Sequence, residues 1–207
     1  LETHLLMTTK PQAFYLHNQS SSELHRADLD SLPSLAAAHS FTDKNAFRKW
    51  CQSSGTRHVF YTLYEPTHPQ QRSSAPNPVK MMHGVVADYD GVPSAIQAAI
   101  PALKFAAGMA PTWLTTTFSG KARLIWAFER PVPVFNSDVF ERFRAILAKE
   151  LKLKSILPGF DEGAWENPHT PFEVGSGWRQ PFGDTRLEQG FVLTSLHDAS
   201  KRAKFKT

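Results

Sequence analysis

Apolar residues along the chain gather in short runs, which are separated by polar segments rich in proline and glycine. Runs of β-branched and aromatic side chains are typical of strands, and alternation along them indicates half-buried sheets. The predicted strands are residues 13–16, 57–64, 80–88, 112–118 and 123–128. One longer stripe of apolar residues at helical spacing predicts a helix over 138–151, for which Asp138 and Glu141 form a capping box.

The remaining pattern predicts shorter helices and one exposed loop. Two short helical stretches are expected between residues 22 and 38, and a further helix over 42–53 ends at Gly55. A helix over 94–108 is expected to bend at Pro101, and residues 66–78, with four prolines, form a loop. The order of strands, helices and a hairpin predicts an α+β fold with a mostly antiparallel sheet and flanking helices.

The segment from Gly84 to Gly91 carries the strongest chemical pattern. It is an apolar run that ends in two carboxylates, Asp88 and Asp90, separated by Tyr89. Because side chains alternate along a strand, the two aspartates project to one face and the tyrosine to the other. Two repelling carboxylates this close favour a divalent cation or acid/base chemistry. An ordinary Asp-Gly turn after a strand is the alternative.

A second cluster of polar residues lies in the predicted hairpin turn over residues 118–123. Ser119 and Gly120 stand beside two cations, Lys121 and Arg123, in a turn that exposes backbone N–H groups. That combination suits phosphate oxygens, although Ser-Gly-Lys is also a common turn. Carboxylates that hold divalent cations, together with donors that hold a polyphosphate, are the minimal parts for nucleotidyl or phosphoryl transfer.

Acidic residues recur in the segment 159–175, where regular patterning fades. Asp161, Glu162 and His169 lie among prolines and glycines there, together with Glu166 and Glu173. Such a composition is typical both of an active-site loop and of an ordinary long loop, and the pattern does not separate the two.

Composition narrows the class of protein without naming it. The 207 residues are 41% hydrophobic, which is enough for a sizeable core, and no apolar stretch approaches the length of a membrane span. The start of the chain lacks the features of a signal peptide, so we expect a cytoplasmic protein. A single Cys51 excludes an internal disulfide and a multi-cysteine zinc site. The net charge of +4 and the basic run 201–206 favour nucleic acid only weakly, since a solvated tail has the same composition.

Three motifs in order resemble the archaeo-eukaryotic primase superfamily. They are the strand end 85–90, the hairpin segment 118–132, and the segment 159–161 with 167–169. Within the superfamily, the likeness is to primase or primase-polymerase domains of plasmid and phage replication proteins, including the Rep initiators of ColE-type plasmids. The pattern spans residues 80–178, and the first 79 residues contribute little to it.

The resemblance implies a fold, an activity and a site. The fold would have an RRM-like catalytic core over residues 80–207 and an N-terminal α/β lobe over 1–79. The activity would be template-directed nucleotidyl transfer from NTP or dNTP on single-stranded DNA during plasmid or phage replication. A helicase, fused or separate, would be a further partner.

The site implied by the resemblance uses two divalent ions, Mg²⁺ or Mn²⁺. Asp88, Asp90 and Asp161 would be the metal-binding and catalytic residues. The nucleotide-binding residues would be Ser119, Gly120, Lys121 and Arg123. One departure stands out, because the histidine position of the family falls on Arg123. A permanent cation binds phosphate but cannot act as an acid or base near neutral pH.

Two other functions fit parts of the pattern. The strand end also resembles the first motif of haloacid-dehalogenase-type phosphatases, in which Asp88 would be the nucleophile and Asp90 the acid/base. That family needs alternating strands and helices after this motif. A non-catalytic replication-initiator module that binds DNA is the third hypothesis, which Arg123 and the basic run at 201–206 favour.

Overall fold

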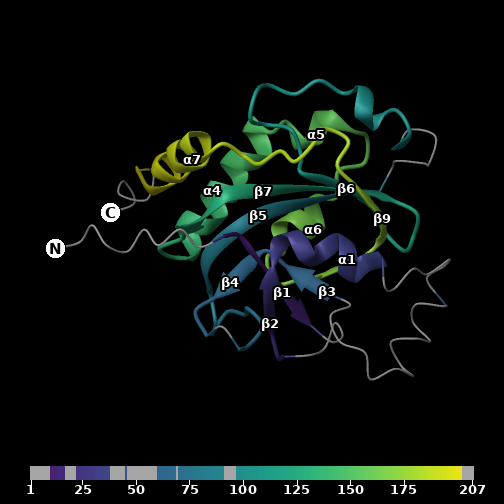
Figure 1. Cartoon of the computed structure of the whole chain (residues 1–207). Helices are drawn as coiled ribbons and strands as arrows, with labels where there is room; N and C mark the ends of the chain where they lie inside the picture. Colours follow the sequence, from purple (N-terminus) through teal and green to yellow (C-terminus); the bar gives the residue numbers. More distant parts are fainter. Residues whose placement is uncertain are drawn as a thin grey trace.

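The protein was analysed as a computed structural model, which describes residues 10–16, 22–37, 45, 60–68, 70–90 and 97–201. Two antiparallel sheets and a set of helices make up these residues (Figure 1). The α+β class and the mostly antiparallel pairing predicted from the sequence are therefore confirmed. Among the described residues, no helix is long and apolar enough to cross a membrane.

The larger sheet has five strands in the order β4-β5-β7-β6-β9, and each pairs antiparallel with its neighbours. The strands are β4 (Tyr64–Pro66), β5 (Val79–Tyr89), β6 (Trp113–Thr116), β7 (Ala122–Pro133) and β9 (Ser176–Arg179). The two long strands β5 and β7 form its centre, and the pairing shifts register at a bulge between Met82 and Gly84. A Cβ atom at Gly84 would collide with the backbone of β7, so this close approach requires glycine.

The smaller sheet has four strands in the order β2-β1-β3-β8. These are β1 (Gln12–Leu16), β2 (His25–Asp28), β3 (Phe60–Thr62) and β8 (Phe172–Glu173). One face packs, together with the short turn η1 (Leu29–Ser31) and α1 (Leu32–Ala37), against the larger sheet through a core that contains Tyr61, Val86 and Ile125. Because β8 comes from late in the chain, it brings Glu173 to the space between the sheets.

Helices cover the other face of the larger sheet (Figure 1). They are α4 (Ser137–Glu150), α5 (Leu153–Ile156), α6 (Glu162–Glu166) and α7 (Gln189–Lys201). The largest core cluster of the described residues lies here and contains Trp126, Phe143 and Leu196. The sheet therefore has two buried faces, which explains why its central strands read as nearly continuous apolar runs.

Several predicted elements differ from those observed. The strand expected at 57–64 is two strands within its described part, β3 and β4, which Leu63 separates. The N-cap of α4 is Asn136, whose side chain accepts a hydrogen bond from the Val139 N–H at 2.8 Å, so the Asp138 capping box is wrong. One of the two helical stretches expected over 22–38 is replaced by β2. The helix over 42–53 lies outside the described residues except for position 45.

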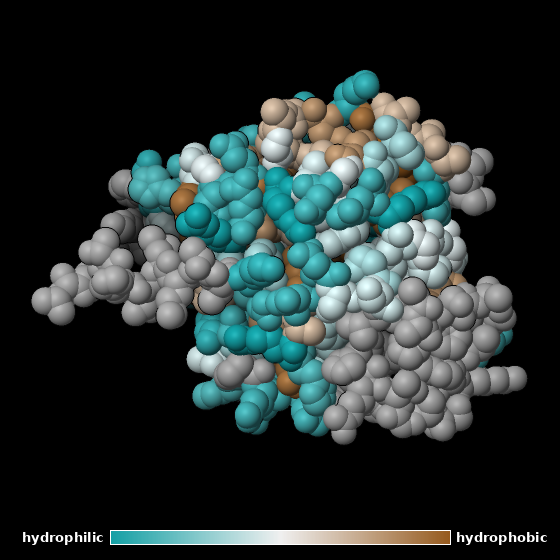
Figure 2. Space-filling view, in the orientation of Figure 1, coloured by the Kyte–Doolittle hydropathy of each residue, from teal (hydrophilic) through white to brown (hydrophobic). Residues whose placement is uncertain are grey.

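The helix expected over 94–108 is present only in part within its described residues, which start at Gln97. Gln97 is helical, but the helix does not continue, and only the 3-10 turn η2 (Ile100–Ala102) follows, because Pro101 removes a backbone donor. Figure 2 shows that apolar residues gather at the top of the molecule, where this segment runs, while hydrophilic residues dominate the rest of that face.

Candidate active site

At the end of β5, successive side chains point to opposite faces of the larger sheet. Tyr89 points to the helical side, where its buried hydroxyl donates to the carbonyl of Leu153 at 3.0 Å. Asp88 points to the other side and lies opposite Arg123 of β7. The alternation expected for this strand therefore places the carboxylate between the two sheets.

A buried guanidinium holds Asp88 through two hydrogen bonds. Arg123 donates from Nε to Oδ1 at 2.5 Å and from Nη2 to Oδ2 at 3.2 Å. Its side chain is only 3% exposed, and the guanidinium also lies over the ring of Phe172 at 5.1 Å from the centroid. Burial alone would lower the pKa of Arg123, but the carboxylates of Asp88 and Glu173 outweigh it and raise the pKa further. Arg123 is therefore a fixed cation here.

Glu173 of β8 is the second carboxylate at this cation, and sequence reasoning did not single it out. Its Oε1 accepts from Arg123 Nη2 and from the Phe118 N–H, both at 3.3 Å, and its carbonyl also accepts from Arg123. Its Oε2 is buried and has no hydrogen-bond partner among the described residues. Burial raises the pKa of Glu173, and the attraction of Arg123 offsets only part of this effect.

The third group beside the guanidinium is Tyr61 of β3, whose side chain is fully buried. Burial raises the pKa of its phenol, so the hydroxyl stays protonated at neutral pH. We refer to Asp88, Arg123, Glu173 and Tyr61 as the Arg123 cluster. Two carboxylates share one cation in this cluster.

A more exposed ion pair forms the rim of the same face. Lys121 Nζ lies 2.6 Å from Asp90 Oδ1, and these side chains are 38% and 52% exposed. Gly120 makes the turn at φ +80°, and its N–H donates to the Thr117 carbonyl at 2.8 Å. The hairpin predicted over 112–128 is confirmed, and it brings both of its cations onto the two aspartates of β5.

Ser119 belongs to the turn itself, because its hydroxyl pairs with that of Thr117 at 3.0 Å. The turn is further fixed by Gln97, whose Nε2 donates to the Gly120 carbonyl at 2.9 Å and whose Oε1 accepts from Thr116 Oγ1 at 3.0 Å. Gln97 is buried and was not recognised in the sequence. The turn is thus held from a segment that lies some twenty residues earlier in the chain.

Asp161 lies beside the strand end but serves a local role. A bridge between Tyr89 and Phe160 puts Asp161 opposite Asp88, and the Asp161 N–H donates to the Asp88 carbonyl at 2.9 Å. Its Oδ1 caps α6 by accepting from the Ala164 N–H at 2.9 Å. The neighbouring Glu162 pairs with Lys154 at 2.7 Å.

Neither His83 nor His169 joins these carboxylates. His83 is buried against Glu65, and His169 contacts Ser73 at 3.2 Å while its carbonyl accepts from Arg72. Burial lowers the pKa of both imidazoles. They are therefore predominantly neutral at neutral pH, and both take part in packing contacts.

The carboxylates have the hard oxygen donors that Mg²⁺ and Mn²⁺ prefer. As arranged, however, Asp88 faces Arg123, Asp90 faces Lys121, and Asp161 caps a helix. Among the residues that the structure describes, no three His, Cys, Asp or Glu side chains form a group suited to a metal ion. Asp88 and Asp90 supply such donors at the end of β5, and Glu173 adds a third carboxylate beside Arg123.

Comparison with models of known protein families finds no match, and no curated protein matches the chain. Among solved structures, the chain is similar to the AEP domain of the primase-polymerase (PrimPol) of cyanophage S-2L. The TM-score is 0.40 and the identity 14%, over 89% of this chain and 88% of that one.

Proposed function

We propose that this chain is a nucleotidyltransferase domain of the primase-polymerase type, which joins nucleotides on a single-stranded DNA template. The observation that carries the proposal is the arrangement at the end of β5. There Asp88 and Asp90 meet the hairpin cations Arg123 and Lys121 on one face of the sheet. The order of the three sequence motifs supports the same function, and plasmid or phage replication is the setting that the resemblance implies.

The chemistry follows from an exchange of partners. Lys121 and Arg123 would turn from the carboxylates to the oxygens of a triphosphate, because phosphate offers both cations a stronger anion. Asp88 and Asp90 would then ligate divalent cations that enter with the nucleotide, and Asp161 is proposed as the third ligand. Such ions lower the pKa of a primer 3′-hydroxyl and neutralise charge on the leaving pyrophosphate.

The backbone N–H groups of the turn would help to hold the triphosphate. Gly120 has nothing within 4 Å of the position of a Cβ atom, so the turn leaves room above it. Ser119 and Lys121 lie on either side of that glycine. These residues would orient the nucleotide, while the buried Arg123 would anchor one phosphate oxygen.

The test is nucleotide incorporation by the purified chain. The protein is incubated with labelled NTPs or dNTPs, single-stranded DNA and Mn²⁺ or Mg²⁺. We expect Asp88→Asn and Asp90→Asn each to reduce incorporation by a factor of at least about 10², as for loss of a group that stabilises a transition state. Asp198→Asn, on α7, is the matched control and should retain activity. If the Asp88→Asn, Asp90→Asn double variant still extended primers, the assignment would be wrong.

A DNA-binding module without catalysis is the second candidate, and the Asp88–Arg123 pair favours it. The Asp88 carboxylate is only 17% exposed and accepts two hydrogen bonds from Arg123, so it is not available to a metal ion unless the guanidinium moves. This candidate predicts DNA binding that weakens as salt rises and does not depend on Asp88, with no metal-dependent synthesis. The incorporation assay therefore separates the two.

The phosphatase alternative does not agree with the observed sheet. It requires alternating strands and helices that build a parallel sheet, whereas β5 is antiparallel to both of its neighbours, β4 and β7. We do not propose this function.

A further inference from the structure

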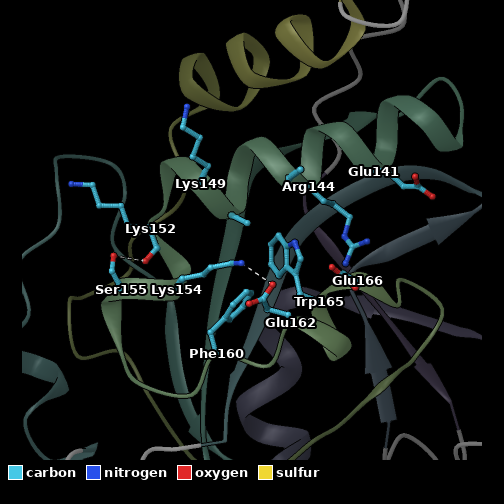
Figure 3. A pocket seen from close by; sticks show the side chains of 12 residues that line it. Glu141, Arg144, Lys149, Lys152, Lys154, Ser155, Phe160, Glu162, Trp165 and Glu166 are labelled. Carbon is cyan, nitrogen blue, oxygen red and sulfur yellow. Dashed lines mark hydrogen bonds and ion pairs between the residues drawn. The ribbon is translucent and has the colours of Figure 1, made fainter. Parts of the chain in front are cut away.

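A groove of about 780 Å³ lies on the helical side of the larger sheet, on the face opposite to Asp88. It is bounded by α4, α5 and α6, and Figure 3 shows its side chains. Part of its lining is apolar, through Ala145, Ala148, Phe160 and Trp165. The proposed function makes no use of this groove.

The groove contains a buried arginine that forms no ion pair with any described residue. Arg144 of α4 is only 4% exposed, and its guanidinium lies over three aromatic rings. The distances to the ring centroids are 5.7 Å for Tyr64, 5.2 Å for Phe140 and 5.2 Å for Trp165. Figure 3 shows the side chain descending from α4 beside the indole of Trp165. The rings orient the charge but supply no hydrogen-bond acceptor.

One hydrogen-bond donor of Arg144 is buried without a partner in the described part of the chain. Its Nε is buried and has no partner among the described residues, and no carboxylate of those residues lies within 4 Å of the guanidinium. A buried charge without a hydrogen-bonding anion is costly to the folded state. This arrangement indicates a place for an anion from outside the described part of the chain.

Charges around the groove are unevenly distributed. Lys149, Lys152 and Lys154 lie toward one end, where Lys154 pairs with Glu162 at 2.7 Å. Lys152, held at φ 54°, pairs with no carboxylate of the described residues. Three acids also line the groove, namely Glu141, Glu162 and Glu166. A ligand must therefore place its negative charge near the cations of the groove and away from its acids.

We propose that the groove binds a peptide of a partner protein that carries a carboxylate next to an apolar side chain. The carboxylate would accept hydrogen bonds from Arg144, the apolar side chain would cover Phe160 and the alanines of α4, and further acids would meet Lys149 and Lys152. This proposal goes beyond the proposed catalytic function and does not depend on it.

A peptide carboxylate suits the groove better than a nucleic-acid strand does. Trp165 is only 7% exposed and already contacts Arg144, so its ring is not an open surface for stacking of bases. A phosphodiester chain would also approach the acids Glu141 and Glu166, which repel it. One carboxylate on an apolar body avoids both problems.

The first experiment uses the unmodified protein and NMR. The Arg144 Nε–H and Trp165 indole N–H signals are followed as phenylpropanoate or its neutral amide is added. We expect the carboxylate to shift both signals with a Kd of about 1 mM, the weak affinity reasonable for a small probe. The amide should bind at least about tenfold more weakly, because it cannot pair with the guanidinium.

The second experiment identifies the source of the carboxylate. The peptide Glu-Glu-Leu-Phe with a free carboxyl terminus should bind at least about tenfold more tightly than phenylpropanoate. Lys152→Gln should remove a measurable part of that gain, and Arg144→Met should abolish the shift of the Trp165 signal. Lys201→Gln, on α7 away from the groove, is the matched control and should bind like the unmodified protein.

Three results would overturn the proposal. Equal binding of the amide and the carboxylate would show that only the apolar surface matters. Equal affinity for phenylpropanoate and the peptide would point to a small free acid instead of a protein partner. Competition by a short oligothymidine that is stronger than by the peptide would assign the groove to nucleic acid.

Discussion

Two glutamates that are mostly shielded from solvent, Glu65 and Glu173, contact cations in very different ways. Glu65 of β4 is 5% exposed and accepts hydrogen bonds from three cationic or imidazole groups. His83 Nε2 and Lys80 Nζ lie at 3.2 Å, and Arg26 also donates to it. Burial alone would raise the pKa of Glu65, but these partners lower it to about 2.

Glu173 of β8 shows the opposite balance. It shares Arg123 with Asp88, its Oε2 has no partner among the described residues, and burial raises its pKa. The Glu65 network is complete, because even His83 is fixed in one tautomer by the Gln12 N–H, which donates to Nδ1 at 2.9 Å. The Glu65 network is fully paired and stabilises the fold. In the Arg123 cluster two carboxylates share one cation and the Glu173 Oε2 has no described partner, which is the kind of perturbed arrangement that ligand sites show.

The largest expected effect comes from removing the shared cation. Arg123→Ala leaves the mostly shielded carboxylates of Asp88 and Glu173 without their shared cation, so we expect the free energy of unfolding to fall by about 3–5 kcal/mol. Urea denaturation measures it. Arg130→Ala, at an exposed position of the same strand, is the control and should cost less than about 0.5 kcal/mol. Adding Glu173→Gln to Arg123→Ala should restore part of the loss. If the stability effects of the two substitutions simply added in the double variant, this result would argue that Asp88 and Glu173 do not share the charge of Arg123.

An intermediate effect is expected at Glu65. Glu65→Gln should lower the free energy of unfolding by about 1–3 kcal/mol at pH 7, because His83 keeps a partner but the charge on Arg26 and Lys80 is no longer balanced. The pKa of Glu65 is depressed, so its contribution is full above the unfolded value near 4.5 and is lost as pH falls toward about 2. Denaturation at several pH values should show the two proteins converging below pH 4.5. If the difference in the free energy of unfolding between the two proteins stayed constant as pH fell, the ionised Glu65 would not be the source of the stability.

The smallest effect is expected at Glu173. Glu173→Gln should change the free energy of unfolding by less than about 1 kcal/mol at pH 7, because the lost attraction to Arg123 and the relieved burial of a charge oppose each other. The pKa of Glu173 is raised, so the ionised carboxylate costs stability above that pKa and this cost disappears as pH falls below it. The free energy of unfolding of the unmodified protein should therefore rise relative to that of the variant as pH falls from 7 toward 4.5. Denaturation curves of both proteins at pH 7 and pH 5 test the direction of this change in relative stability.

Strong local patterns made much of the fold predictable. The apolar strand that ends at Asp88, the Ser-Gly-Lys turn and the stripe of α4 all form where the sequence places them. The failures have physical causes. Asn136 outcompetes Asp138 as the cap, and Pro101 with its alanines does not sustain a helix. Local propensity does not decide such competitions.

The candidate site was predictable only in part. Asp88, Asp90, Lys121 and Arg123 do meet, because a hairpin necessarily brings its turn to the end of the neighbouring strand. Glu173 was not recognised, since it lies in a segment without regular pattern and reaches Arg123 through β8, a strand of the other sheet. Arg144 was also missed, because an arginine on a helix stripe looks exposed until its aromatic neighbours are known.

By itself, the sequence determined the antiparallel α+β class and the two aspartates on one face, because residue alternation and hairpin geometry are local. Only the tertiary structure decided which charges are paired. It set Arg123 between Asp88 and Glu173, completed the Glu65 network and left the Nε of Arg144 without a partner among the described residues. Burial and distance control these electrostatic outcomes, and both depend on segments that are remote in the chain.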